Sequence, residues 1–403
     1  MSAVAQSNSS EKFAIRPFNA SFPETELAEL RRRISATRFP DRETVMDNSQ
    51  GVPLETTQKL AKYWVTEYDW RDCEARINAH PNFITEIDGL DIHFIHARSK
   101  HENALPIIIT HGWPGSIVEQ LKLIEPLTNP TAHGGKESDA FHVVIPSIPG
   151  YGFSGKPTAT GWNPPRIARA WGTLMERLGY TKYVAQGGDW GGLIVEEMAA
   201  LAPKGLVGIH TNFPRVVPPD VDKAAQSGAP APADLSAEEK VAYERVKDVY
   251  AKGIAYGFQL GLRPQSVSAL ADSPVGLAAY LLDHDALSLA LIVRAFDGEP
   301  TGLTRDDVLD NLTLFWLTNT GISSARLYWE NKLPYFQASN FSLPVAVSAF
   351  PDELYPAPRS WVEKAYRNVI FYNKQEIGGH FAAWEQPMLL TQDIRAGLSS
   401  LRS

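Results

Sequence analysis

The sequence predicts an α/β protein whose parallel sheet is interrupted by a helical insertion. Three observations lead to this prediction. Apolar runs typical of buried strands alternate with helical stretches between residues 81 and 213. Helical patterning then fills residues 236–340, and apolar runs return at 343–353 and 368–381. A helical block inserted late into such a sheet is expected to cover the carboxyl ends of the strands, where ligands bind.

The N-terminal segment, residues 1–80, is expected to be a helical extension. Its first part, residues 1–12, is polar and expected to be disordered. Apolar residues between Leu27 and Ile34 recur with the spacing of one helix face, and a second helical stretch covers residues 54–79. Both helices are expected to precede the first strand.

The core is expected in two parts, residues 81–213 and 341–403, separated by a helical lid at 214–340. Two alternating runs meet at Asp88-Gly89, a sequence typical of a β-hairpin turn. Further strands are predicted at 106–112, 141–150, 343–353 and 368–381, and residues 183–192 are predicted as a strand that runs into a Gly-rich turn. Helices are predicted at 163–179, directly after 192 and near 385–400.

Composition excludes several classes of protein. The chain has 403 residues and a net charge of −8, and its basic residues are scattered, which argues against nucleic acid or anionic lipid as a partner. No apolar run approaches the roughly 20 residues of a membrane helix, and the N-terminus lacks the pattern of a secretory signal. The single cysteine, Cys73, cannot form an internal disulfide. We therefore expect a cytoplasmic protein without a membrane anchor.

The turn Gly187-Gly188-Asp189-Trp190-Gly191 has the form G-x-Nu-x-G, where Nu is a nucleophile. In the α/β-hydrolase fold this pattern is a sharp strand-to-helix turn, and small residues flank the nucleophile because the backbone is crowded there. Asp replaces the usual Ser. A carboxylate attacks sp³ carbon and forms an alkyl ester, which water can cleave. The simpler alternative is that Asp189 only caps the following helix.

The loop His111-Gly112-Trp113-Pro114-Gly115 follows a predicted strand. Such a loop supplies one backbone N–H to an oxyanion hole, and the residue after the nucleophile supplies the second. The expected donors are therefore Trp113 and Trp190. His111 precedes the nucleophile in the chain, whereas the base comes last in this fold, so His111 is expected to hold the loop.

The last histidine, His380, lies in a Gly-bearing loop after a predicted strand, where an exposed imidazole is expected. A histidine whose pKa lies near neutrality can take a proton from water. Asp352 and Glu353 follow the preceding strand, and neighbours in an extended chain point in opposite directions. Only one of them is expected to face the imidazole, and spacing alone does not choose between them.

Together these motifs resemble the microsomal-type epoxide hydrolase family, which includes juvenile-hormone and fungal epoxide hydrolases. The matching segments are Phe13 to Phe18, Tyr68 to Arg71, His111 to Ser116, Gly187 to Gly191, Asp272 to Leu277 and Gly379 to Phe381. The resemblance spans nearly the whole chain. It implies an α/β-hydrolase fold with a helical lid and an N-terminal extension that wraps core and lid. Membrane-bound members carry an anchor helix at the N-terminus, and no such helix is expected here.

The resemblance also implies residue roles and a reaction. It places two lid tyrosines, Tyr256 and Tyr328, as donors to the epoxide oxygen, and it selects Glu353 as the acid that orients His380. The implied reaction converts a small apolar epoxide and water into a vicinal diol through an ester on Asp189, without a cofactor or metal. A role in the detoxification of foreign epoxides is also implied.

Two alternatives use the same fold. A haloalkane dehalogenase also has Asp at this turn, but halide release requires Trp or Asn N–H donors in the lid, whereas epoxide opening favours the paired tyrosines. A non-catalytic relative that acts as a binding protein typically lacks the nucleophile or the histidine, and both are present here. A homo-oligomer is compatible with the sequence.

Overall fold

The computed structural model describes residues 14–300 and 302–402, so the disorder expected at residues 1–12 lies outside the described residues. In the described part the strands form one sheet with the order β1-β2-β3-β5-β4-β6-β7-β8-β9. The strands are β1 Arg16–Phe18, β2 Asn82–Ile87, β3 Leu90–Ala97, β4 Leu105–Thr110, β5 Phe141–Pro146, β6 Tyr183–Gly187, β7 Leu206–Thr211, β8 Val345–Ala349 and β9 Val369–Lys374.

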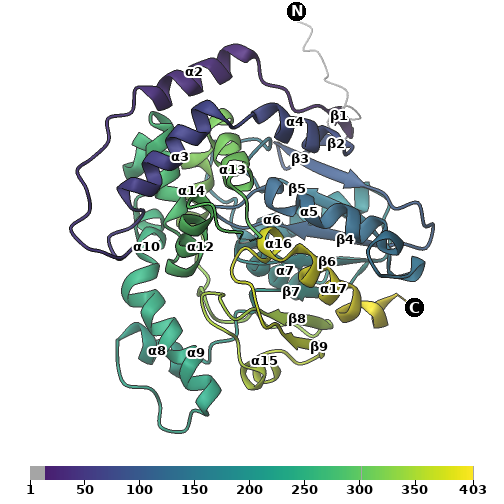
Figure 1. The fold of residues 1–403 in the computed structure, drawn as a ribbon. Coiled ribbons are helices and arrows are strands. Elements are labelled where there is room, and N and C mark those ends of the chain that lie inside the picture. Colours follow the sequence, from purple (N-terminus) through teal and green to yellow (C-terminus); the bar gives the residue numbers. More distant parts are fainter. Residues whose placement is uncertain (1–13, 301, 403) are drawn as a thin grey trace, which may run out of the picture.

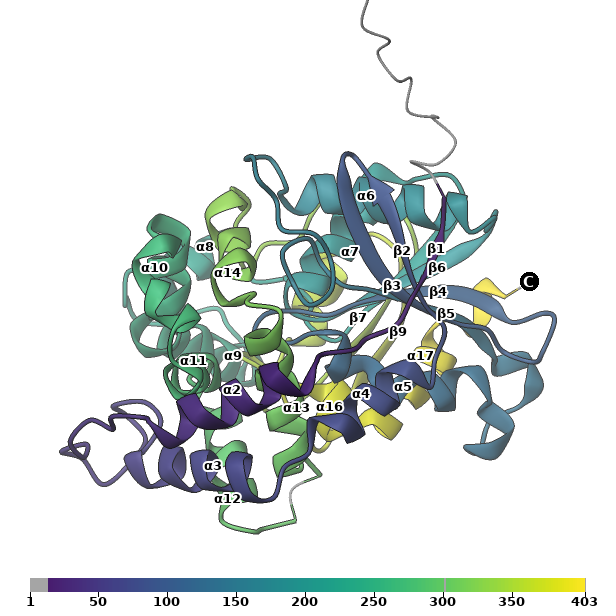
Figure 2. The same cartoon turned by 90° about the horizontal axis from the view of Figure 1, so that it is seen from above.

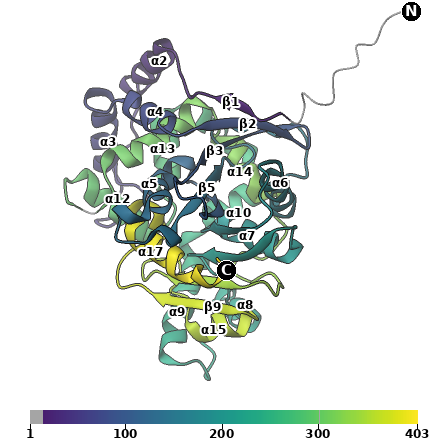
Figure 3. The same ribbon diagram turned by 90° about the vertical axis from the view of Figure 1, so that its right-hand side faces the viewer.

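Strands β1, β2, β3 and β5 pair antiparallel, and the sheet from β5 through β4 to β9 is parallel. Asp88 and Gly89 both have positive φ angles, of 52° and 80°, which is the geometry of the predicted hairpin turn. Figure 3 shows helices α6 and α7 on one face of the sheet and α5 and α17 on the other. Because both faces are covered, the residues of the central strands are buried almost throughout rather than on alternate positions.

The helices divide into a strap, a core set and a lid set. The strap comprises α2 Glu24–Ser35, α3 Leu54–Thr66 and α4 Trp70–Asn78. The core set comprises α5 Ile117–Thr128, α6 Pro164–Arg177, α7 Trp190–Leu201, α15 Arg359–Ala365, α16 Ala382–Glu385 and α17 Pro387–Gly397. The lid set comprises α8 Pro219–Gln226, α9 Ala237–Asp248, α10 Ala255–Leu262, α11 Pro274–Leu282, α12 Ala286–Phe296, α13 Arg305–Leu317 and α14 Gly321–Glu330.

Two expectations for the N-terminal segment were wrong. Strand β1 precedes the helices and pairs with β2, and it was missed because a three-residue edge strand containing Pro17 carries no periodic signal. The stretch 54–79 is two helices rather than one. Helix α3 ends at Thr66, and Asp69 accepts a hydrogen bond from the backbone N–H of Arg71 to begin α4. Three predicted strands were also too long, because β5, β8 and β9 end before the limits of 150, 353 and 381 that the apolar runs suggested.

The strap joins the core to the lid, as Figures 1 and 2 show. The indole N–H of Trp64 donates to the hydroxyl of Thr313 at 2.9 Å, and the Tyr68 hydroxyl donates to Asp310 at 2.8 Å. Arg76 forms an ion pair with the same Asp310 carboxylate. The described residues contain no helix whose length and apolar character suit a membrane span. The boundaries at 80, 213 and 340 stay predictions.

We predict that Trp64→Ala lowers the free energy of unfolding by about 3–5 kcal/mol, the usual cost of deleting a buried aromatic side chain. Trp64 of strap helix α3 is 2% exposed and contacts Thr313 of the lid. Urea denaturation followed by circular dichroism measures the change. Met46→Ala serves as the control because Met46 is fully exposed, and it should change stability by less than about 0.5 kcal/mol. Equal losses in the two variants would contradict a stabilising strap.

Candidate active site

The turn between β6 and α7 is tightly folded around Asp189. Asp189 has φ 50° and ψ −128°, a conformation that costs a non-glycine residue about 1–3 kcal/mol. A Cβ on Gly187 would collide with the backbone of Gly191, and a Cβ on Gly191 would collide with the carbonyl oxygen of Thr110. The carboxylate makes no capping hydrogen bond to α7. The helix-cap alternative therefore fails, and the side chain is free to face the lid.

The two oxygens of Asp189 have different surroundings. The backbone N–H of Trp113 donates to Oδ1 at 2.7 Å, and Oδ2 lies 3.7 Å from Nε2 of His380. Gly112 allows this approach, since a Cβ there would overlap the carboxylate. The N–H of Trp190 opens α7, where backbone N–H groups have no partner within the helix. Both predicted oxyanion donors thus lie beside the nucleophile.

His380 is oriented by Glu353 and not by Asp352. Nδ1 of His380 lies 2.5 Å from Oε1 of Glu353, and both side chains are buried. Asp352 is exposed and meets Gly379 only through a backbone bridge. The prediction of an exposed imidazole was wrong, because His380 is only 5% exposed. The lid covers it, and the ring of His284 stacks on it with centroids 4.3 Å apart.

Three carboxylates set the protonation of His380. Burial lowers the pKa of the imidazole, but the negative charges of Glu353, Asp189 and Asp285 outweigh burial and raise that pKa to about 10. Below that pH the ring is an imidazolium. It therefore forms an ion pair with Asp189 before any substrate reacts.

The two predicted tyrosines reach the nucleophile from the lid. Tyr256 on α10 stacks on Trp113 with ring centroids 5.0 Å apart, and Tyr328 on α14 meets Trp190 edge-on at 4.8 Å. Both tyrosines line a cavity of about 40 Å³, and Asp189 lines the same cavity. Burial and the charge of Asp189 raise both tyrosine pKa values well above the ordinary value. Both phenols are therefore protonated and can donate hydrogen bonds.

A second cavity of about 10 Å³ reaches Asp189 from the core and is polar. Its lining includes Glu119, Gln186, Asn212 and His380. Burial raises the pKa of Glu119 to about 8, opposed by the charge on His380 and reinforced by Asp189. The side-chain oxygen of Gln186 is buried and has no hydrogen-bond partner in the part of the chain that the structure describes. A polar cavity of this size with several partners suits one water molecule.

His111 holds the loop that carries Trp113, the role expected from its place in the chain. Its Nε2 accepts the backbone N–H of Ile148 at 3.2 Å, and its Nδ1 lies 2.9 Å from the carbonyl oxygen of Gly112. Burial lowers its pKa to about 4, so the ring is neutral and can accept that bond.

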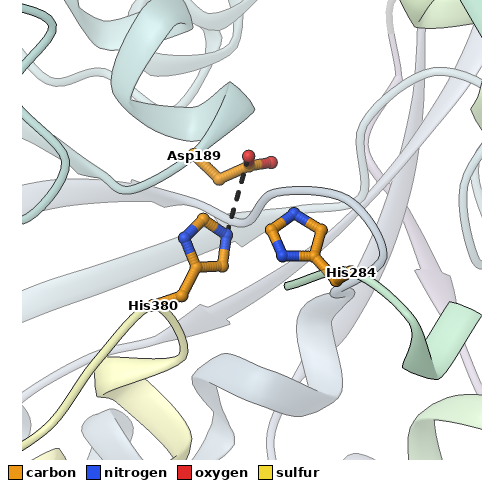
Figure 4. A group of neighbouring side chains, drawn as sticks. All are labelled: Asp189, His284 and His380. Carbon is orange, nitrogen blue, oxygen red and sulfur yellow. Dashed lines mark ion pairs between the residues drawn. The ribbon is translucent and has the colours of Figure 1, made fainter. Parts of the chain in front are cut away.

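The sequence reasoning missed His284, which lies beside His380 and Asp189 (Figure 4). Its Nδ1 is 3.0 Å from Oδ2 of Asp285, and Asp285 caps α12 by accepting the backbone N–H groups of Leu287 and Ser288. Asp285 as the cap of α12 could have been predicted from the sequence, because Asp is a preferred residue at the start of a helix. Nothing in the spacing of a single histidine within the lid indicated contact with the site.

Comparison with known proteins places the chain in a family. Residues 15–120 match the family described as "Epoxide hydrolase N terminus", and residues 106–235 match "alpha/beta hydrolase fold". A protein of Stigmatella aurantiaca, provisionally named an epoxide hydrolase, is 50% identical over 394 residues, covering 96% of this chain and 86% of that protein. The chain belongs to the epoxide hydrolase family. The epoxide hydrolase 1 of Oryctolagus cuniculus is 35% identical, with 95% of this chain and 88% of the relative covered.

Solved structures of the same family have the same architecture. The juvenile hormone epoxide hydrolase of Bombyx mori superposes with a TM-score of 0.83 at 28% identity, covering 98% of this chain and 96% of that one. The Aspergillus niger epoxide hydrolase gives a TM-score of 0.80 at 29% identity, with 97% of each chain covered. The predicted α/β-hydrolase fold and the family resemblance are confirmed.

We predict that Glu353→Gln slows turnover by several orders of magnitude, in line with roughly 10⁴ for the equivalent loss in a serine triad. The amide carries no charge to hold the imidazole in its orientation. Asp352→Asn is the matched control and should cost little, since its side chain is exposed. Steady-state rates of diol formation measure both. A larger loss of rate in Asp352→Asn than in Glu353→Gln would show that Asp352, and not Glu353, orients the imidazole.

Proposed function

We propose that the chain converts an apolar epoxide and water into a vicinal diol through a covalent ester on Asp189. The observation that carries this proposal is the position of the carboxylate. It borders the cavity of the two tyrosines and also faces His380 and the polar cavity of the core. Family membership supports the reaction class, and no cofactor or metal takes part in it.

The first step uses Oδ2 of Asp189, which accepts no hydrogen bond from the described residues and lies 3.7 Å from Nε2 of His380. Oδ1 is held by the N–H of Trp113, so Oδ2 is the nucleophile. As Oδ2 bonds to a ring carbon, the bond from that carbon to the epoxide oxygen breaks, and its electron pair goes to that oxygen. Tyr256 and Tyr328 stabilise the developing alkoxide, and one phenol supplies its proton.

Ester formation also removes the negative charge of Asp189. That charge helps to raise the pKa of His380, so its loss lowers the affinity of the imidazole for its proton. The proton released by His380 restores the phenol that protonated the alkoxide. The first step therefore ends with a neutral imidazole, the form that a general base requires.

The second step returns the enzyme to its starting state. His380 takes a proton from water, and the hydroxide attacks the ester carbonyl while the N–H groups of Trp113 and Trp190 bind the oxyanion. The bond between the carbonyl carbon and the ester oxygen then breaks, and the leaving alkoxide takes the second proton of that water to complete the diol. Asp189 keeps the water oxygen and regains its charge beside the imidazolium. Glu119, Gln186 and Asn212 suit the supply of this water because their cavity touches Asp189.

The lid cavity favours apolar substituents on the epoxide. Besides Asp189 and the tyrosines, its lining is largely apolar and includes Leu193, Phe213, Ile254, Phe336 and Leu354. Burying apolar surface stabilises binding by about 25 cal/mol per Å². A cytoplasmic location, a detoxifying role and a homo-oligomeric state are further proposals that rest on the sequence.

Haloalkane dehalogenation is a second candidate, favoured by one observation. The indole N–H groups of Trp113 and Trp190 are buried and have no hydrogen-bond partner among the described residues, and such groups can bind a halide. The phenols of Tyr256 and Tyr328 favour the epoxide, because an alkoxide needs a proton and a halide does not. Diol formation from an epoxide and halide release from a bromoalkane, measured side by side, distinguish the two reactions.

We predict that His380→Gln forms the ester but does not hydrolyse it. Asp189 keeps its nucleophilic oxygen, whereas the attacking water loses its base. Mass spectrometry of the intact variant should then show the protein plus one substrate mass, located on the peptide that contains Asp189. Asp189→Asn is the control and should accumulate no adduct. If His380→Gln turns over at the wild-type rate, His380 is not the base.

We predict that Tyr256→Phe or Tyr328→Phe slows ester formation by roughly 10–10³-fold, comparable to or below the loss of one oxyanion donor. The double variant should be nearly inactive towards epoxides, while hydrolysis of a preformed ester should be almost unchanged. Pre-steady-state quenching of tryptophan fluorescence measures ester formation because Trp113 and Trp190 flank the site.

The control for the tyrosine variants is Tyr180→Phe, whose hydroxyl contacts His96 outside the site. It should form the ester at the wild-type rate. Ester formation at that same rate in the double variant would show that Tyr256 and Tyr328 only pack against the tryptophans.

A further inference from the structure

His284 is a buried histidine that the proposed reaction does not use. It lies between α11 and α12, and its side chain is 1% exposed. Its Nε2 is buried and has no hydrogen-bond partner in the described chain. Leaving a buried polar atom unpaired costs about 1–3 kcal/mol. A ligand that binds this nitrogen would remove that cost.

His284 and His380 are anchored in the same way. Nδ1 of His284 contacts the carboxylate of Asp285 at 3.0 Å, and Nδ1 of His380 contacts the carboxylate of Glu353 at 2.5 Å. Metal-binding histidines characteristically donate one ring N–H to a carboxylate, which fixes the ring and presents the other nitrogen to the ion. The two ring centroids are 4.3 Å apart, and the ring planes are tilted by 30° to each other.

The carboxylate of Asp189 completes a set of three donors. One atom each from Asp189, His284 and His380 lies within 4.8 Å of the other two, and Figure 4 shows both imidazoles on the same side of the carboxylate. Three atoms this close all lie within about 2.8 Å of a common point, and zinc binds N and O ligands at about 2.0–2.2 Å. Movements of each donor atom by less than about 1 Å would therefore bring all three within bonding distance of one zinc ion.

We propose that Asp189, His284 and His380 form a Zn²⁺ site at which the ion inhibits the enzyme. Two imidazoles and one carboxylate are a common zinc ligand set, with a fourth position left for water. The bound ion would replace the proton on Nε2 of His380, because a metal binds only the neutral imidazole, and it would also occupy the Asp189 carboxylate. The two steps of the proposed reaction require both groups. Inhibition thus rests on the proposed function, whereas metal binding rests only on the positions of the side chains.

Metal binding is tested directly with Co²⁺, which replaces Zn²⁺ and absorbs visible light when bound by nitrogen and oxygen ligands. The full-length wild type should bind one equivalent and show this absorption. His284→Phe, which keeps a stacking ring, should lose it. Asp285→Asn keeps a capping oxygen for α12 and should weaken Co²⁺ binding about 10–100-fold, the usual effect of losing a carboxylate behind a metal-binding histidine. His80→Phe controls for other histidines and should match the wild type.

Inhibition is tested with Zn²⁺ and styrene oxide, each variant being compared with its own rate without metal. The Zn²⁺ concentration for half inhibition should rise at least 10-fold in His284→Phe and stay unchanged in His80→Phe. Equal Co²⁺ absorption in wild type and His284→Phe would overturn the site, and equal Zn²⁺ inhibition would overturn its inhibitory role. If Asp189→Asn turned over epoxides normally, the proposed reaction would fail while the Co²⁺ result still decided the metal site.

Discussion

The negative charge of Asp189 is the interaction on which the rest of the site depends. It lies among largely buried groups, and it is balanced by one backbone N–H and one imidazolium. The same charge raises the pKa values of Tyr256, Tyr328 and Glu119. Electrostatic interactions are strong in such surroundings because little water screens them. In the proposed reaction, neutralising this single carboxylate would change the pKa values of these three groups and of His380 at once.

The backbone around Asp189 maintains this arrangement. Gly112, Gly187 and Gly191 lie where a Cβ would collide with the carboxylate or the neighbouring chain. Because these three glycines have no side chain, the Trp113 loop, the β6–α7 turn and the end of β4 can come into close contact. The positive φ of Asp189 is tolerated because these contacts leave the turn no alternative. Geometry and electrostatics are thus imposed by the same few backbone contacts.

Much of this arrangement could be predicted because it is local. The apolar runs, the Asp88-Gly89 hairpin and the Gly187–Gly191 turn each carry their signal within a few residues. The choice of Glu353 over Asp352 depends on which way two adjacent side chains face, and only the family resemblance supplied it. The burial of His380 and the position of His284 arise from lid packing between residues about a hundred positions apart, which no local pattern encodes. Strand β1 was missed because three residues are too few for periodicity.

The strap has a consequence for how members of this family can be recombined. Its helices contact α11, α12 and α13, so the lid is bound to an N-terminal segment from which it is separated in the sequence by much of the core. A lid transplanted from another hydrolase would meet a strap shaped for different neighbours, and Tyr68 and Arg76 of the strap would lose their shared partner Asp310. Strap and lid are therefore expected to be inherited together. Chimaeras should exchange them as one module, although they are far apart in the gene.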